Sequence, residues 1–274
     1  IDTLIPSSEN ETLAISKYIN LFKNNKIKIP VSSFDTVNLM TDKLKMFEYL
    51  NYSGVDVGKW KKIDNFSDAA NALNFFGYPS KKVIIKPRFS SGSRGILIAN
   101  HKKNSFTNLL GDRLCGEGSW EAIKEELKNS NRSLDNYFVM PFHEGKTFDV
   151  DCIAKEGNLV MAVSRLRVYE NPLSPTNQGC IIGPNKTIYN YCVKLVKAFK
   201  IYGACDFDIV IRKDSRPQLL DSSCRLSGSV GASLNAGVNV VAELIKMLHG
   251  KKPKKIKLLK NVKVFPTPIF VKSL

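Results

Sequence analysis

The chain lacks any long apolar run. Apolar residues make up 43% of its 274 residues, close to the average for globular proteins, yet no stretch approaches the roughly 20 apolar residues that a helix needs to cross a bilayer. Ile1 to Leu21 contains neither a basic leader nor an apolar signal core, so we expect no targeting segment. These absences favour a soluble protein without a membrane partner. The first residue, Ile1 in place of a methionine, is what a cut end would give.

Close pairs of cysteine or histidine are also lacking. The six cysteines are scattered without a Cys-x-x-Cys pair, which argues against a zinc ribbon or a thioredoxin-like motif and fits reduced thiols in a cytoplasmic protein. The three histidines show no paired metal-binding spacing, which argues against zinc-dependent hydrolysis. We interpret His143 as a hinge residue rather than a catalytic base.

Acidic residues are outnumbered by basic ones. There are 41 Lys and Arg against 25 Asp and Glu, a net charge of +16 that favours acidic partners such as nucleotides, nucleic acids or anionic membranes. A lysine run near the C-terminus keeps nucleic-acid binding open as an alternative. No aromatic-interleaved motif accompanies the run, so we interpret it as a solvated lysine-rich edge. The run consists of Lys251, Lys252, Lys254, Lys255 and Lys257.

Alternating strand-like and helix-like segments predict an α/β (α+β) chain. The opening apolar run Thr3 to Pro6, a helical stretch to Phe22 and a strand at 26–31 read as the end of an alternating α/β unit. Thr41 or Asp42 is a candidate cap for a helix that Gly54 ends. We predict three parts with limits 1–53, 54–143 and 144–274.

A glycine-bearing polar turn is the first candidate for ligand binding. The apolar strand 83–85 ends in Lys86, and the turn Ser90 to Gly95 then leads into a second strand at 96–99. Successive backbone N–H groups, small side chains and flexible glycines allow such a turn to wrap phosphate oxygens. The alternatives are an ordinary strand-end lysine and an ordinary surface hairpin.

Further elements follow a predicted hinge at Glu144-Gly145. Strands are indicated at 148–154 and 159–166, separated by the hairpin signal Glu156-Gly157-Asn158. An irregular loop, 169–183, is expected to shape an acceptor site. An amphipathic helix carries Cys192, Leu195, Val196 and Phe199, and a last helix spans about 239–249.

Two predicted neighbouring strands carry the second candidate, a pair of carboxylates. Asp208 alternates with Asp206 on the strand 204–211, and Asp221 ends the strand 218–221. Carboxylates on adjacent strands can share a magnesium ion, which prefers oxygen ligands and is typically completed by substrate phosphates. Arg225, just beyond, is placed to steady a transferring phosphate. The alternative is an exposed hairpin with solvated acids.

Taken in order, these segments resemble the ATP-grasp superfamily, and most closely ligases similar to the carbamoyl-phosphate synthase large chain. The likeness covers most of the chain. It implies an ATP-grasp fold, in which two lobes clasp ATP, preceded here by the end of a truncated pre-ATP-grasp α/β domain. The blocks that carry it are Thr41-Asp42-Lys43, Ile84 to Pro87 with Ser90 to Gly95, Phe138 to Asp151, and Asp206-Phe207-Asp208 with Leu220 to Arg225.

The resemblance also implies roles for individual residues. Lys43 and Lys86 would contact the ATP phosphates, Lys86 and Arg225 would act in catalysis, and Arg165 with Arg167 would grip a substrate carboxylate. The loop residues Ser90, Ser91, Gly92 and Ser93 would close over the phosphates. Main-chain groups near Pro141, Phe142 and His143 would bind adenine, Thr147 would stand at the ribose position, and Asp208, Asp221 and Ser223 would hold Mg²⁺, with Mn²⁺ as a substitute.

The implied reaction is ATP-dependent phosphorylation of a carboxylate, followed by attack of an amine on the acyl phosphate. The chain would act on small molecules, as a homo-oligomer or with a partner subunit. Two residues depart from the family pattern, because Asp221 is one methylene shorter than the usual glutamate and Ser223 replaces the usual asparagine. These departures leave open an alternative, a catalytically weak ATP-binding subunit or nucleotide sensor of a split synthetase.

Overall fold

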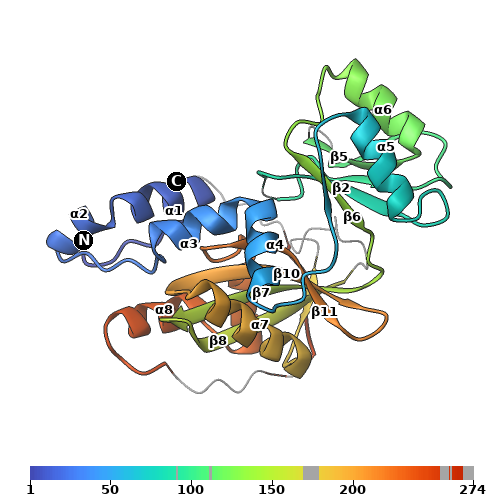
Figure 1. Ribbon diagram of the computed structural model, residues 1–274. Helices are drawn as coiled ribbons and strands as arrows, with labels where there is room; N and C mark the ends of the chain where they lie inside the picture. The colour runs from blue at the N-terminus through green and yellow to red at the C-terminus, as the bar shows by residue number, and fades with distance from the viewer. Residues whose placement is uncertain (91, 111–112, 169–178, 254–258, 260, 268–274) are drawn as a thin grey trace, which may run out of the picture. The chain divides into compact units, whose positions relative to one another are not determined.

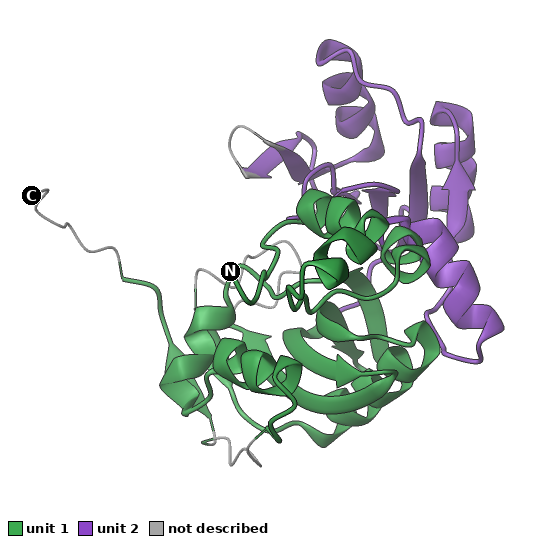
Figure 2. Ribbon diagram, turned by 90° about the vertical axis from the view of Figure 1, so that its left-hand side faces the viewer, with its two compact units in different colours: residues 1–40, 145–274 green, residues 41–144 purple. Residues whose placement is uncertain are grey.

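The computed structural model describes residues 1–90, 92–110, 113–168, 179–253, 259 and 261–267. By its contacts the chain forms two compact units, coloured separately in Figure 2. Unit 1 contains residues 1–40 and 145–274, and unit 2 contains residues 41–144. Both units combine helices with a six-stranded sheet, which confirms the predicted α/β (α+β) class.

The sheet of unit 2 has the strand order β1-β6-β2-β3-β5-β4. Its pairs are antiparallel except for β3 and β5, which run parallel. The predicted strand 83–85 and the strand after the glycine-bearing turn pair with one another, which confirms the predicted hairpin. The strands are β1 Lys61–Ile63, β2 Val83–Pro87, β3 Leu97–Ala99, β4 Thr107–Leu110, β5 Arg113–Gly118 and β6 Tyr137–Pro141.

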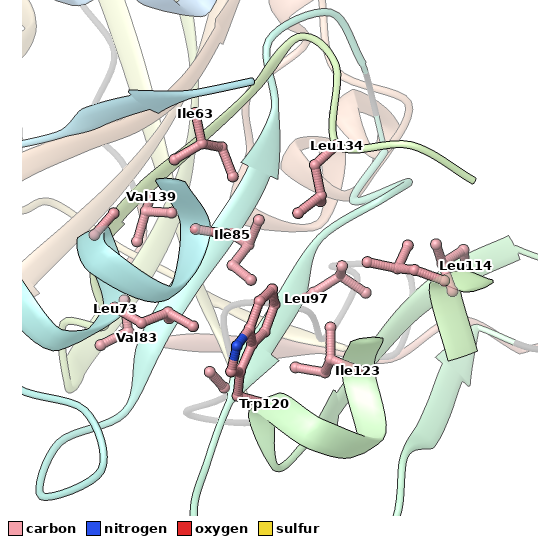
Figure 3. Packing of buried hydrophobic residues seen from close by; sticks show 14 residues of the cluster. Ile63, Leu73, Val83, Ile85, Leu97, Leu114, Trp120, Ile123, Leu134 and Val139 are labelled. Carbon is pink, nitrogen blue, oxygen red and sulfur yellow. The ribbon is translucent and has the colours of Figure 1, made fainter. Parts of the chain in front are cut away.

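Two helices, α5 Phe66–Phe75 and α6 Trp120–Asn129, pack on one face of this sheet (Figure 3). The spacing of Trp120, Ile123 and Leu127 predicts a common helical face, and all three are buried. They share one apolar cluster with the sheet residues Ile85 and Leu97. This core fixes the strand from which Lys86 projects.

A third helix, α4 Lys43–Tyr52, joins unit 2 through its apolar side. Asp42 is its N-cap, as predicted, because its carboxylate accepts a hydrogen bond from the Lys45 N–H. The Phe47 ring lies 5.6 Å from Trp60 and 5.8 Å from Phe138, centroid to centroid. Because these contacts bind 41–53 to unit 2, the observed grouping differs from the predicted first limit at residue 53.

The sheet of unit 1 is antiparallel, with the order β11-β10-β7-β8-β9-β12. The predicted β7–β8 hairpin is confirmed, with Glu156 and Gly157 at φ 52° and 79° in the turn. The strands are β7 Gly145–Lys155, β8 Asn158–Arg167, β9 Cys180–Ile182, β10 Gly203–Arg212, β11 Pro217–Ser223 and β12 Val262–Val264.

One prediction about this sheet was wrong. The segment 169–183 was expected to be irregular, but Cys180–Ile182 forms the strand β9, which pairs with both β8 and β12. Three residues are too few for a period of two to show in the sequence, so pairing with neighbours decides their conformation. Residues 169–178 of the predicted loop lie outside the described part of the chain.

Helices pack on both faces of the unit 1 sheet. The predicted apolar face of α7 Lys186–Phe199 is buried, and the Cys192 thiol on this face contacts Cys152 of β7. On the opposite face, α8 Val240–Leu248 and the 3₁₀ helix η2 Val230–Ala236 share a cluster that includes Leu244, Ile153, Val163 and Ala204. That apolar cluster covers only part of its face.

The N-terminal segment forms α1 Glu9–Lys17, α2 Ile19–Asn24 and α3 Phe34–Thr41, labelled in Figure 1. The two strands predicted here reduce to a single parallel bridge, Thr3 to Lys28. Pro30 has no N–H to extend that ladder. Instead, its carbonyl accepts a hydrogen bond from Ala204 N–H at 3.2 Å, and a Cβ added to the neighbouring Gly203 would lie 2.1 Å from the same oxygen.

Within the described ranges, no helix has both the length and the apolar character needed to cross a bilayer. All six cysteines are described, and each is a buried free thiol, as expected.

Candidate functional site

The glycine-bearing turn of unit 2 lies between β2 and β3. Lys86, only 5% exposed, is the penultimate residue of β2 and stands opposite Phe138 of β6. Gly92, Ser93 and Gly95 have φ values of 63°, 61° and 77°, a left-handed region that glycine adopts without strain. The predicted loop residue Ser91 lies outside the described ranges.

Lys43 lies beside this turn, next to an ion pair between Asp42 and Arg88 at the start of α4. Its buried amino group donates a hydrogen bond to the Ser90 carbonyl. The Asp42 carboxylate accepts two hydrogen bonds from Arg88, at 2.7 and 2.6 Å. Burial raises the pKa of Asp42, but the bonds from Arg88 and from the Lys45 N–H, together with the positive charges of both residues, lower it by more, so the net shift is downward. Lys43 and the turn, predicted to act together, therefore do lie together.

Pro141, Phe142 and His143 form the end of β6 and the residues that follow it. Each is partly exposed. The Phe142 N–H donates to the Lys82 carbonyl at 3.4 Å, and the Lys82 amino group lies 5.4 Å from the centre of the Phe142 ring. In unit 1, Thr147 is buried on β7 opposite Val210 of β10, so it contributes a short side chain at the predicted ribose position.

A row of charged residues crosses four strands of the unit 1 sheet. Asp221 of β11 lies opposite Asp208 of β10, Asp208 lies opposite Asp149 of β7, and Asp149 lies opposite Arg165 of β8. Directly opposite residues of antiparallel strands project from the same face, with Cα atoms about 4.5 to 5.5 Å apart. The carboxylates of Asp208 and Asp221 are therefore cross-strand neighbours.

A second row runs beside the first, two residues closer to the start of β10. Asp206 lies opposite Ser223 on one side and Asp151 on the other. Asp206 Oδ1 and Ser223 Oγ are buried and have no hydrogen-bond partner among the described residues. A β-bulge between Asp208 and Ile209 accompanies the two rows, and bulges of this kind re-aim side chains.

Arg165 and Arg167 were predicted to grip a substrate, with a solvated strand face as the alternative. The alternative is wrong, because the two residues are only 0% and 7% exposed. Arg165 forms an ion pair with Asp151 and donates to Ser227 Oγ at 2.6 Å. Arg167 Nη2 lies 2.5 Å from Asp149 Oδ1 and 2.9 Å from Asp208 Oδ2.

Carboxyl groups outnumber guanidiniums by five to three in this group of residues. Burial, partly offset by Arg167 and reinforced by Asp149, raises the pKa of Asp208 to about 7. Burial and the neighbouring Asp151 raise the pKa of Asp206 well above its ordinary value. The group contains the carboxylates of Asp149, Asp151, Asp206, Asp208 and Asp221 and the guanidiniums of Arg165, Arg167 and Arg225.

Two of these carboxylates, Asp208 and Asp221, are placed to share a cation. Among the residues that the structure describes, no cluster of three or more His, Cys, Asp or Glu side chains is arranged to hold a metal ion. Asp208 and Asp221 form a pair, which suits Mg²⁺ because that ion usually takes one or two carboxylates and completes its octahedron with phosphate and water oxygens. The unsatisfied hydroxyl of Ser223 and the crowded carboxyl groups, which raise the pKa of Asp206 and Asp208, both favour a cation at this place.

Arg225 lies at the edge of the acidic group. Its Nη1 is 3.7 Å from Asp206 Oδ2, and its Nη2 is 3.8 Å from Glu9 of α1. These are long contacts, and the close hydrogen bond of the guanidinium to a described residue is from Nη1 to the Leu226 carbonyl, at 2.9 Å. The guanidinium therefore remains available to an anionic ligand.

Comparison with known proteins shows which family the chain resembles. Residues 133–267 match a family model described as ATP-grasp in the biosynthetic pathway with Ter operon. Over 234 residues, 82% of this chain, the sequence is 21% identical to the carbamoyl phosphate synthase large chain of Pseudothermotoga lettingae. The chain is similar to the ATP-grasp superfamily in sequence and in fold. It spans about a fifth of the length of that relative, 20%.

Solved ATP-grasp structures show the same fold. The biotin carboxylase domain of the 2-oxoglutarate carboxylase of Hydrogenobacter thermophilus, in complex with MgADP and bicarbonate, superposes with a TM-score of 0.66 at 16% identity, covering 95% of this chain and 56% of that one. N5-carboxyaminoimidazole synthetase from Staphylococcus aureus gives 0.64 at 16% identity, covering 94% of this chain and 63% of that one. These results confirm the predicted resemblance and fold.

Sequence reasoning missed part of the acidic group. Asp149 and Asp151 alternate on one strand in the same way as Asp206 and Asp208, and that repeated spacing was the available signal. Of the lysine run, Lys251 and Lys252 are exposed after α8, whereas Lys254, Lys255 and Lys257 lie outside the described residues. The nucleic-acid alternative therefore stays a prediction.

Proposed function

We propose that this chain is the nucleotide-binding body of a ligase that uses ATP and Mg²⁺ to phosphorylate a carboxylate, which an amine then attacks. The observation that carries the proposal is the cross-strand pair Asp208 and Asp221, within a group of five carboxyl groups and three guanidiniums. In unit 2, the buried Lys86 and Lys43 beside a glycine-bearing turn supply the complementary positive charge. The similarity to a carbamoyl phosphate synthase large chain supports the same reaction class.

In the proposed reaction, a carboxylate oxygen attacks the γ-phosphorus and the bond to the β-phosphate oxygen breaks, releasing ADP. The amine then attacks the acyl carbon, loses a proton, and phosphate leaves. Lys43 and Lys86 neutralise phosphate oxygens, while Arg225 faces the transferred group. Magnesium, when bound by Asp208, Asp221 and Ser223, supplies further charge neutralisation. Positioning and charge account for most of the catalysis in phosphoryl transfer.

Binding is tested by thermal shift with ATP, Mg²⁺ and a panel of amino acids. A ligand at 100 times its dissociation constant adds about 2.7 kcal/mol of stability. We expect Lys86→Ala to weaken the response to ATP and Asp221→Asn to remove its dependence on Mg²⁺. Lys59→Ala, which removes an exposed lysine of unit 2, is the matched control and should respond like the wild type. Unchanged responses in both site variants would refute the assignment.

The proposal requires Lys86 and Asp221 to act on one ATP molecule. The double variant tests this requirement, because residues that share a ligand give non-additive effects whereas independent residues give additive ones. We expect the loss of Mg·ATP affinity in the double variant to be smaller than the combined losses of the single variants. Additive losses would contradict a shared nucleotide.

The short side chains of Asp221 and Ser223 favour a second candidate, an ATP-binding subunit or sensor without turnover. Release of ADP and phosphate separates the two candidates. We expect ADP to form when ATP, Mg²⁺ or Mn²⁺, an amino acid and an amine are supplied together. Binding of Mg·ATP without ADP formation for any carboxylate and amine mixture would favour the sensor.

A further inference from the structure

Arg167 occupies a position that the expected substrate role does not explain. Its guanidinium joins three neighbouring strands, since Arg167 is on β8, Asp149 on β7 and Asp208 on β10. Nη2 contacts both carboxylates, and Nε donates a further bond to Asp149 Oδ1 at 3.1 Å. With 7% of the residue exposed, the guanidinium presents little surface to a substrate.

Asp208 therefore has different neighbours on its two sides. Toward β7 its Oδ2 accepts the bond from Arg167, and Asp149 is the residue directly opposite. Toward β11 the residue directly opposite is Asp221. Two adjacent pairs of carboxylates thus share Asp208, and the Arg167 guanidinium contacts both members of the pair with Asp149.

We infer that Arg167 is a built-in cation that fills the place between Asp149 and Asp208, and so confines a bound divalent ion to the other side of Asp208, beside Asp221. The inference rests on the proposed function, since it concerns the metal position of the same site. A guanidinium suits this task because it is permanently charged and donates from several N–H groups in fixed directions. A metal ion in the same place would need at least these two carboxylates as ligands.

This inference assigns Arg167 to the arrangement of the metal site rather than to substrate binding. Arg167 is a positioning residue, because it acts on the metal through Asp208. The two assignments predict different behaviour when the guanidinium is removed. Loss of a built-in cation exposes an additional metal-binding pair, whereas loss of a substrate-binding group raises the KM for the carboxylate and leaves metal binding unchanged.

The experiment counts Mn²⁺ ions bound per chain by electron paramagnetic resonance, with protein free of nucleotide. We expect Arg167→Ala to bind one more Mn²⁺ ion than the wild type at the same total concentration, and Arg167→Lys to match the wild type because it keeps the charge. The additional ion should disappear when Asp149→Asn is added to Arg167→Ala. An unchanged count in Arg167→Ala, or an additional ion that survives Asp149→Asn, would overturn the inference.

A control variant distinguishes the loss of the Arg167 guanidinium from the loss of any positive charge in unit 1. Lys246→Ala also removes one positive charge from unit 1, where Lys246 pairs with Glu243 on α8, and it should leave the Mn²⁺ count unchanged. Circular dichroism checks that each variant is folded, and Arg167→Gln serves if Arg167→Ala does not fold. An additional ion in Lys246→Ala would also overturn the inference.

A second set of measurements distinguishes this inference from the proposed function. The same count is repeated with a non-hydrolysable ATP analogue. If the wild type binds no nucleotide, the proposed function fails, while the additional ion in Arg167→Ala still supports the built-in cation. If the wild type binds the analogue with Mn²⁺ but Arg167→Ala gains no ion, only the inference about Arg167 fails.

Discussion

The ion pair at the start of α4 allows a quantitative prediction. Arg88→Gln leaves the Asp42 carboxylate, with 6% of its side chain exposed, without the guanidinium that contacts it at 2.7 and 2.6 Å. Exposed pairs contribute at most about 1 kcal/mol, whereas breaking a buried pair costs about 3 to 5 kcal/mol. Because the Arg88 side chain is 22% exposed, we expect an intermediate cost of about 2 kcal/mol.

Urea unfolding monitored by tryptophan fluorescence measures this cost. Both tryptophans, Trp60 and Trp120, belong to unit 2, so the signal reports the unit that contains the ion pair. A double-mutant cycle with Asp42→Asn isolates the pair, because asparagine keeps an oxygen that caps α4. A coupling free energy below about 0.5 kcal/mol, the usual limit of additivity, would refute the reasoning.

The same pair sets a pH dependence. The folded state lowers the pKa of Asp42, so the pair's contribution is fully present above the unfolded pKa of about 3.9 and is lost as pH falls through the folded value. The penalty of Arg88→Gln should therefore be constant near neutral pH and shrink below about pH 4. A penalty that grows on acidification would contradict the assignment of charge.

Three further predictions concern packing and burial. Gly203→Ala should destabilise unit 1 by more than about 1 kcal/mol in calorimetry, because its Cβ would lie 2.1 Å from the Pro30 carbonyl oxygen and its φ of 90° is positive. The control Gly250→Ala also has a positive φ, 71°, but no described atom lies near its Cβ, so it should cost less. Arg165→Met should cost about 3 to 5 kcal/mol in urea unfolding followed by circular dichroism, because it leaves the fully buried Asp151 carboxylate without its guanidinium partner. A smaller loss than in Arg88→Gln would contradict this. The native thiols should resist a thiol-specific reagent at pH 8 and all six should react in urea, because they are buried and burial raises the pKa of Cys115, for example, to about 11. Rapid reaction of the folded protein would show that the units open readily.

Elements with strong periodicity could be predicted from the sequence. The helices α6 and α7 carry apolar residues at intervals of three and four, and α4 has a capping Asp42. The β7–β8 hairpin has a glycine in its turn. These signals depend on residues close together in the sequence, so they can be recognised without knowledge of the tertiary structure.

Short strands and the partners of charged residues could not be predicted in the same way. β9 has only three residues, and pairing with β8 and β12 defines it. Arg165 and Arg167 differ little from solvated strand residues in the sequence. Their burial depends on the cross-strand register, which brings Asp149, Asp151 and Asp208 to the same face.

The face of the unit 1 sheet beneath α8 is divided along the strands. Ile153, Met161 and Ala204 lie in its apolar half, and the acidic rows begin one pair of residues further on. Folding free energy is thus gained in one half, while the other half holds like charges together at a cost that a cation would relieve. Because burial and Asp151 raise the pKa of Asp206, Asp206→Asn should raise the melting temperature of the ligand-free protein and reduce the stabilisation by added metal. The site would then be less stable without its ligand than the fold allows.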